Sequence, residues 1–153
     1  MKSLIGQGYM RMLNKFLILA LLVSPCSSAL AQNDVIPVYV RSLCSDDPVG
    51  NRISFKVREG VRKSSAMRLV ESPEDAVFKM SLKCIEPKHN EGYASDFSYT
   101  LTATNLDGYY DYAIKYGVRS CGSSRVDECA DGLVADMDTA IIEALKHFDV
   151  KVF

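Results

Sequence analysis

The sequence has no tryptophan and only two histidines, His89 and His147, among its 153 residues. It also lacks the Cys-x-x-Cys pair, the Gly-x-Ser-x-Gly and Gly-x-Gly-x-x-Gly motifs, the phosphate-binding P-loop and the His-Glu-x-x-His motif. The two histidines stand at no metal-ligand spacing, which disfavours zinc. We therefore expect no catalytic residue, no metal and no cofactor, and we interpret the chain as a non-enzyme.

Long hydrophobic runs are absent as well. The most apolar stretch is residues 16–23, whereas a transmembrane helix needs about 20 residues. This stretch follows Lys15 and precedes Ala29-Leu30-Ala31, which is the arrangement of a secretory signal peptide cleaved after Ala31. We expect residues 1–31 to be a signal peptide, residues 32–153 to form a single domain, and the mature protein to be periplasmic or secreted.

Two features of this segment leave alternatives. A lipoprotein would carry its lipid on Cys26, but Pro25 stands where lipoprotein signals have a small residue, so we favour cleavage and release. Residues 1–11 carry no secretory pattern, and a compact signal peptide begins at Met12. Met12 is therefore the alternative start of translation.

The chain has no excess of basic residues. It contains 18 Lys and Arg against 19 Asp and Glu, and three of the basic residues and no acidic residue lie in residues 1–31. Cleavage leaves 15 basic and 19 acidic side chains, a net charge of −4. Nucleic-acid binding requires a basic face, so we expect no nucleic-acid partner.

Four cysteines remain after cleavage: Cys44, Cys84, Cys121 and Cys129. An even number of cysteines in a small exported chain indicates two disulfides. Four cysteines allow three pairings. The short loop between Cys121 and Cys129 favours that bond, which leaves Cys44 with Cys84. A bond from Cys84 to the region of Cys121 is the main alternative.

Hydrophobic periodicity predicts the element order β-α-β-β-β-β-α. Asp47 and Pro48 are typical of a helix start, and apolar residues recur every four positions from Val49 to Val61. Because Pro37 lacks a donor, the first strand is expected to begin at Val38 or to lie at a sheet edge. The expected strands are residues 35–40, 67–70, 76–85, 97–104 and 110–119, and the expected helices are residues 47–64 and 124–148.

This order predicts an α+β fold, a two-layer sandwich with a mixed, mostly antiparallel sheet and two helices on one face. A parallel strand–helix–strand unit would lead into an antiparallel meander. We expect the other face of the sheet to be hydrated and to carry Ser98, Thr100, Thr102, Lys115 and Arg119.

In the last strand the larger apolar residues alternate with Lys115 and Arg119 and therefore point to the opposite face. They are Tyr110, Tyr112, Ile114, Tyr116 and Val118. We expect these alternating side chains to face the core or its rim, with Tyr112 and Ile114 in the core.

The element order resembles the small bacterial envelope domains at the amino terminus of the Tol translocation propeller protein and in the curli-secretion lipoprotein group. The segment Val61-Arg62-Lys63-Ser64-Ser65-Ala66-Met67-Arg68-Leu69-Val70, where a helix ends in small polar residues before a strand, carries the likeness, which covers most of residues 35–148. The resemblance implies a fold and no function. In that topology Cys84 ends an antiparallel strand at the sheet edge opposite Cys44, which conflicts with a bond between them.

The candidate contact residues are aromatic or basic. Tyr93 and Tyr109 fall in a loop and a turn, where tyrosine often anchors a protein interface. Arg52, Lys56 and Arg58 form a basic face on the first helix. We therefore predict a small exported binding or assembly protein that acts by protein–protein contact, such as an accessory part of a cell-envelope complex or an inhibitor or immunity protein. The alternative is a small secreted hydrolase that uses paired carboxylates.

Overall fold

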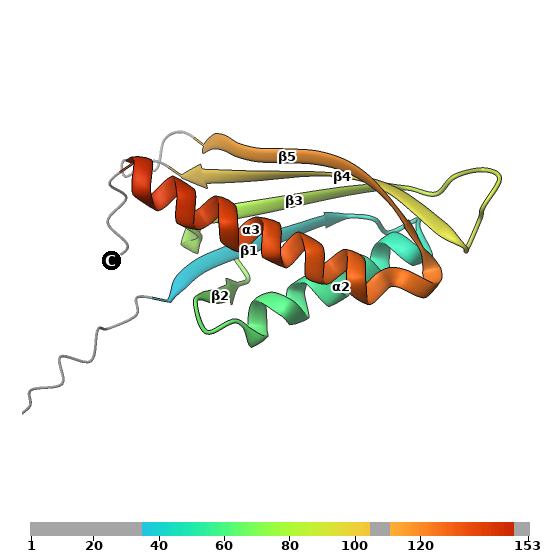
Figure 1. Ribbon diagram of the computed structural model, residues 1–153, viewed down its shortest axis with the longest axis horizontal. Helices are drawn as coiled ribbons and strands as arrows, with labels where there is room; N and C mark the ends of the chain where they lie inside the picture. Colours follow the sequence, from blue (N-terminus) through green and yellow to red (C-terminus); the bar gives the residue numbers. More distant parts are fainter. Residues whose placement is uncertain (1–34, 105–110, 149–153) are drawn as a thin grey trace, which may run out of the picture. The chain divides into compact units, whose positions relative to one another are not determined.

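The computed structural model describes residues 35–104 and 111–148 (Figure 1). The predicted signal peptide and Tyr109 lie outside the described residues. The strands are β1 (Ile36–Leu43), β2 (Met67–Val70), β3 (Phe78–Ile85), β4 (Ala94–Thr104) and β5 (Asp111–Gly122). The helices are α2 (Pro48–Lys63) and α3 (Val126–Phe148), and two short 3-10 turns are η2 (Pro73–Asp75) and η3 (Ser123–Arg125).

The start of α2 is where the sequence places it. The Asp47 carboxylate accepts a hydrogen bond of 2.7 Å from the Gly50 N–H, and Pro48 is the first helical residue. The second Asp47 oxygen accepts a hydrogen bond of 2.6 Å from the buried Ser95 hydroxyl of β4. This carboxylate therefore caps the helix and ties it to the sheet.

The sheet has the strand order β2-β1-β3-β4-β5. β1 pairs in parallel with β2 and with β3, and β3, β4 and β5 are antiparallel neighbours. The prediction that Pro37 delays β1 or marks an edge strand is wrong. β1 begins at Ile36 and lies between β2 and β3. Pro37 has no N–H to donate, but the pairing with β3 begins only at Val38, so no hydrogen bond to β3 is lost.

The expected antiparallel meander is present in β3, β4 and β5, but β2 does not lead directly into it. β2 pairs only with the first half of β1, and residues 71–77 carry the chain past β1 to its other side, where β3 runs parallel to β1. Cys44 directly follows β1, and Cys84 lies near the end of its parallel neighbour β3, so the two cysteines are at the same end of the sheet. They form a disulfide with a Cα–Cα distance of 4.7 Å, and Cys121 is bonded to Cys129.

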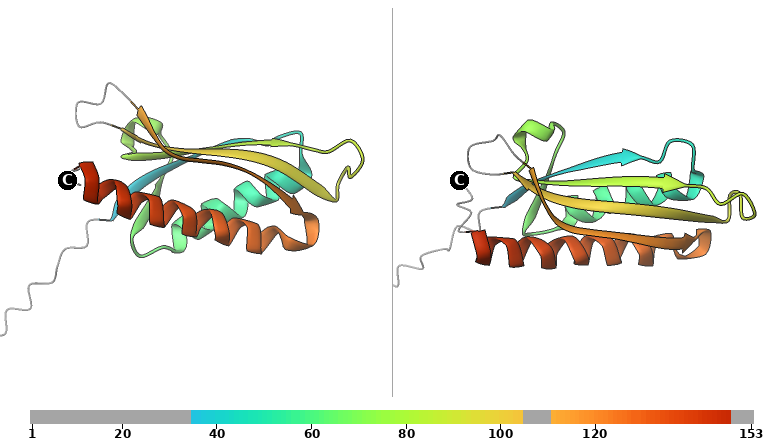
Figure 2. Two further views of the ribbon diagram at one scale, coloured as in Figure 1. Left: turned by 45° about the horizontal axis from the view of Figure 1, so that its top comes forward. Right: turned by 90° about the horizontal axis from the view of Figure 1, so that it is seen from above.

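Both helices lie on one side of the sheet, which makes the fold a two-layer α+β sandwich as predicted (Figure 2). The core between the layers is apolar. Its largest fully buried side chains include Phe78, Phe97, Ile53, Leu133 and Ile141, contributed by two strands and both helices.

The predicted phase of β5 holds at its start, where Tyr112 pairs with the buried Ala103, and is wrong from Lys115 onward. Tyr116 pairs with Thr100 and Val118 with Ser98, on the face away from the helices, whereas Lys115 and Arg119 pair with the buried Leu101 and Phe97. A β-bulge between Leu101 and Thr102 shifts the register in the middle of the strand.

A polar cluster explains why cations face the helices there. Asp136 of α3 accepts hydrogen bonds from the Arg119 guanidinium at 2.6 Å and from the Tyr99 hydroxyl at 2.7 Å, and it lies 3.7 Å from the Lys115 ammonium. Tyr112 is 54% exposed, which contradicts its assignment to the core, whereas Ile114 packs partly buried against the core.

Candidate interaction surface on the outer face of the sheet

We call the sheet face opposite α2 and α3 the outer face. Strand register arranges its side chains in rows that cross β1, β3, β4 and β5. One row, the Arg41 row, consists of Arg41, Ser81, Thr100 and Tyr116. The next row, the Leu43 row, consists of Leu43, Lys83, Ser98 and Val118. Ser98, Thr100 and Thr102 lie on this face, as the alternation in β4 predicts.

Large apolar side chains on the outer face are unusually open to solvent. Tyr116 is 81% exposed and Val118 is 79% exposed, although both lie within a regular strand. Ile85 at the end of β3 and Leu43 at the end of β1 are exposed as well. Exposed apolar groups gathered on one face are typical of surfaces that contact another molecule.

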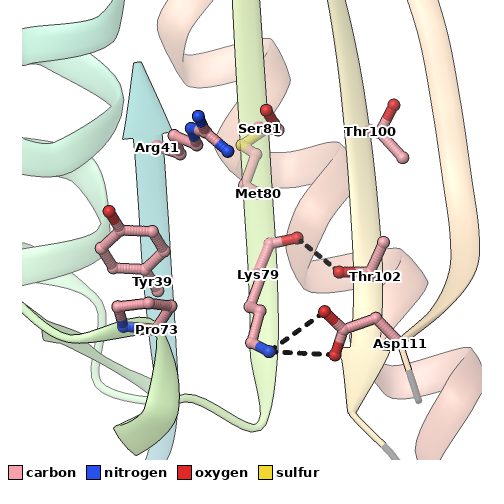
Figure 3. Close-up of a pocket in the computed structure, with 9 residues that line it drawn as sticks. All are labelled: Tyr39, Arg41, Pro73, Lys79, Met80, Ser81, Thr100, Thr102 and Asp111. Atoms are coloured by element: carbon pink, nitrogen blue, oxygen red, sulfur yellow. Dashed lines mark hydrogen bonds and ion pairs between the residues drawn. The ribbon is translucent and has the colours of Figure 1, made fainter. Parts of the chain in front are cut away.

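A hollow of about 540 Å³ opens on the same face, beside the Arg41 row (Figure 3). Residues from four strands and from η2 line it: Tyr39, Arg41, Pro73, Lys79, Met80, Ser81, Thr100, Thr102 and Asp111. The hollow is wide enough to receive a side chain of a bound partner.

An ion pair closes one end of this hollow. The Lys79 ammonium lies 3.0 Å from one Asp111 carboxylate oxygen (Figure 3). The Thr104 hydroxyl donates to the same oxygen at 2.9 Å. Partial burial disfavours the charged carboxylate, but the hydrogen bonds from Lys79 and Thr104 outweigh it, so the pKa of Asp111 is lowered. The positive charge of Lys79 is therefore already compensated.

Arg41 lies toward the other end of the hollow and is exposed. Among the described residues, no ion pair involves Arg41 or Lys83. These two cations stand in adjacent rows. Ser81 is the neighbour of Arg41 on β3, and Thr100 follows it on β4. This part of the outer face therefore presents hydrogen-bond donors and positive charge.

The basic residues predicted on α2 lie on the helix side of the molecule. The Lys56 ammonium is 2.8 Å from Asp127, whose hydrogen bond and charge raise the pKa of Lys56. Arg58 pairs with Glu71 at 2.9 Å, and Arg52 is exposed. The basic face is therefore divided between internal ion pairs and solvent.

Tyr93 is 75% exposed in the loop before β4, and its carbonyl accepts a 2.7 Å hydrogen bond from the Ser123 N–H. Sequence reasoning missed Leu43, Ile85 and Arg41, and it assigned Tyr116 and Val118 to the core or its rim. Only the strand register, which links residues distant in the chain, brings these side chains to one face.

Two other kinds of feature are absent from the residues that the structure describes. Within residues 35–104 and 111–148, no group of three or more His, Cys, Asp or Glu is placed to hold a metal ion. Over the same ranges, neither helix combines the length and hydropathy that a membrane span requires. The two disulfides, in contrast, are typical of a protein that folds in an oxidising compartment.

The sequence matches no family model and no curated protein. Solved structures with a similar fold include a protein from Caulobacter crescentus provisionally described as a lipoprotein, with 12% identity over 69% of this chain and 90% of that chain and a TM-score of 0.41. The PelC dodecamer from Paraburkholderia phytofirmans has 16% identity over 70% and 89% of the two chains and a TM-score of 0.42. A hypothetical protein from Chlamydia trachomatis has 11% identity over 71% and 95% and a TM-score of 0.39.

At these identities the comparisons concern the fold alone and assign no function. None of the three is the Tol propeller domain, so the resemblance to that domain stays a prediction.

Proposed function

We propose that this chain is a small exported binding protein that docks a protein partner on the outer face of its sheet and catalyses no reaction itself. The predicted signal peptide and the two disulfides support a periplasmic or secreted location. The proposal covers an accessory part of a cell-envelope complex and an inhibitor or immunity protein equally, because both act by surface contact.

The observation that carries the proposal is the exposure of Tyr116 and Val118 on a sheet face that neither helix covers. A strand side chain on a hydrated face is usually polar, and Ser98 and Thr100 of β4 follow that rule. Replacing Tyr116 and Val118 by serine would remove apolar area from water without opening the core. The presence of two large apolar groups at these positions therefore favours burial against another protein.

Photocrosslinking in cells of the source organism tests the proposal. A benzoylphenylalanine placed at Tyr116 or Val118 should give one discrete adduct with a partner protein. The same probe at Ile142, an exposed apolar residue of α3 on the helix side, is the matched control and should give none.

A Leu43→Ser, Ile85→Ser double variant should reduce the adduct formed from Tyr116 while leaving the thermal midpoint unchanged, because both side chains are exposed. Adducts of equal yield from Ile142, or no adduct from either outer-face position, would contradict the proposal.

A further inference from the structure

We propose that the partner segment on the outer face is acidic, and that one of its carboxylates binds Arg41 at the hollow in the sheet. This inference rests on the proposed function and names the chemistry of its partner. It concerns the part of the outer face formed by the Arg41 row and the Leu43 row.

Charge on the outer face is opposite to that of the mature chain. The strands place four basic side chains and two acidic side chains there: Arg41, Arg68, Lys79, Lys83, Asp96 and Asp111. The chain without residues 1–31 has a net charge of −4. Glu74 of η2, next to the lining residue Pro73, reduces this surplus at the Lys79 end of the hollow. The Arg41 row and the Leu43 row hold two cations and no carboxylate, so this part of the face attracts an anionic partner.

Most cations on the helix side are held in ion pairs, although Arg52 and Lys63 are in none of those among the described residues. Lys56, Arg62 and Arg125 each lie within 2.8 Å of a carboxylate oxygen of the same chain. Arg41 and Lys83 take part in no such pair among the described residues. Arg68 is in none of these pairs either, so the outer face leaves three of its four cations available for a carboxylate from outside the chain.

The acidic groups near the hollow lie away from Arg41. Asp111 is bound by Lys79 and Thr104, and Glu74, next to the lining residue Pro73, accepts a hydrogen bond from the Ser72 hydroxyl. That hydrogen bond is the main cause that lowers the pKa of Glu74, with Lys79 contributing. Negative charge therefore gathers at the Lys79 end of the hollow, and the Arg41 end stays positive.

The neighbouring groups favour a peptide carboxylate. The Arg41 row continues from the guanidinium through the Ser81 and Thr100 hydroxyls, which can donate to the same anion. The Leu43 row beside it offers exposed leucine and valine on either side of Lys83 and Ser98. A segment with both acidic and apolar side chains satisfies both rows, whereas an acidic polysaccharide supplies no apolar side chains.

Fluorescence anisotropy with labelled octapeptides tests this inference on the mature protein with both disulfides intact. The probe peptide alternates Glu and Leu, and its control alternates Gln and Leu. We expect the Glu peptide to bind at least about tenfold more tightly, because a hydrogen-bonded ion pair with arginine typically changes affinity by that factor or more. The difference should shrink as sodium chloride is raised.

Variants locate the effect. Arg41→Gln should weaken binding of the Glu peptide by about tenfold, and Lys83→Gln should weaken it less. Arg52→Gln, an exposed arginine on α2, is the matched control and should stay within about twofold of the wild type. An equal loss from Arg52→Gln, or no preference for the Glu peptide, would overturn the inference.

Further measurements distinguish an acidic peptide from other anionic ligands and from a second copy of this chain. Tighter Arg41-dependent binding of oligogalacturonate, or of phosphatidylglycerol vesicles, would overturn the inference in favour of those ligands. So would an oligomer in sedimentation that Arg41→Gln dissociates. If the crosslink from Tyr116 persists at full yield in Arg41→Gln, the inference fails while the proposed function stands.

Discussion

Gly117 is the residue of β5 whose replacement should most clearly disturb the fold. An alanine Cβ at this position would lie 2.6 Å from Cε1 and 2.8 Å from Cζ of the Tyr99 ring. Real Cβ atoms do not approach a ring this closely, so the ring or the strand must move. The ring cannot turn freely, because Tyr99 is buried, donates to Asp136 and lies under the Arg119 guanidinium, 5.7 Å from the ring centroid.

The expected cost of Gly117→Ala follows from two effects. Overpacking a filled site costs about 2 kcal/mol, and loss of the hydrogen bond from Tyr99 to Asp136 adds about 1 kcal/mol. A total of about 3 kcal/mol should lower the thermal midpoint by roughly 12 °C in a domain of this size. Urea unfolding followed by circular dichroism, with the disulfides intact, measures the change in free energy of unfolding.

Gly122→Ala is the matched control in the same strand. Its added Cβ would meet only the Tyr93 carbonyl oxygen, at 3.9 Å, and its backbone is extended. Both substitutions restrict the unfolded chain by the same amount, so their difference isolates the clash with Tyr99. If Gly117→Ala is no less stable than Gly122→Ala, the packing of Tyr99 beneath β5 is wrong.

Three further outcomes are expected. Burial, followed by the hydrogen bond to Asp136, raises the pKa of Tyr99. The contribution of Tyr99 to stability is therefore complete below about pH 10 and is lost as the pH rises through the folded-state pKa. Tyr99→Phe should reduce this loss of stability at alkaline pH, measured as the thermal midpoint against pH. Removing the Cys44–Cys84 bond, which spans 40 residues, should cost roughly 4 kcal/mol, against roughly 2.5 kcal/mol for the Cys121–Cys129 bond, which spans 8. Equal losses in urea unfolding would contradict that order. Val118→Thr should change the free energy of unfolding by less than about 0.5 kcal/mol, whereas a loss above 2 kcal/mol would place Val118 in the core.

The sequence predicts those elements whose signals are local. Asp47 and Pro48 mark the start of α2 because a cap and a fixed φ act within one turn. The alternation from Phe97 to Ala103 identifies the buried side of β4 for the same reason. The direction of β3 has no local signal. Residues 71–77 are too few for the crossover that normally joins parallel neighbours. They suffice here because β2 ends opposite Tyr39 and β3 begins opposite Val38, so the chain crosses β1 without returning along the length of a strand.

The candidate site escaped prediction because the pattern in β5 was interpreted by hydrophobicity alone. The Tyr99 ring fills the space over β5 on the helix side and requires Gly117 there, and Asp136 supplies a partner for Lys115 and Arg119. The contact between β5 and α3 is thus polar, and the alternate residues Tyr116 and Val118 face solvent.

Nothing in the folding of this domain requires tyrosine and valine in that exposed phase. Consistent sequences place polar residues on a hydrated strand face, and departures from this rule are expected where function demands them. The disagreement between hydrophobic pattern and burial in β5 is therefore itself evidence about function. It makes Tyr116 and Val118 the first residues to test for contact with a partner, and the predicted contact residues in the loops and on α2 stay predictions.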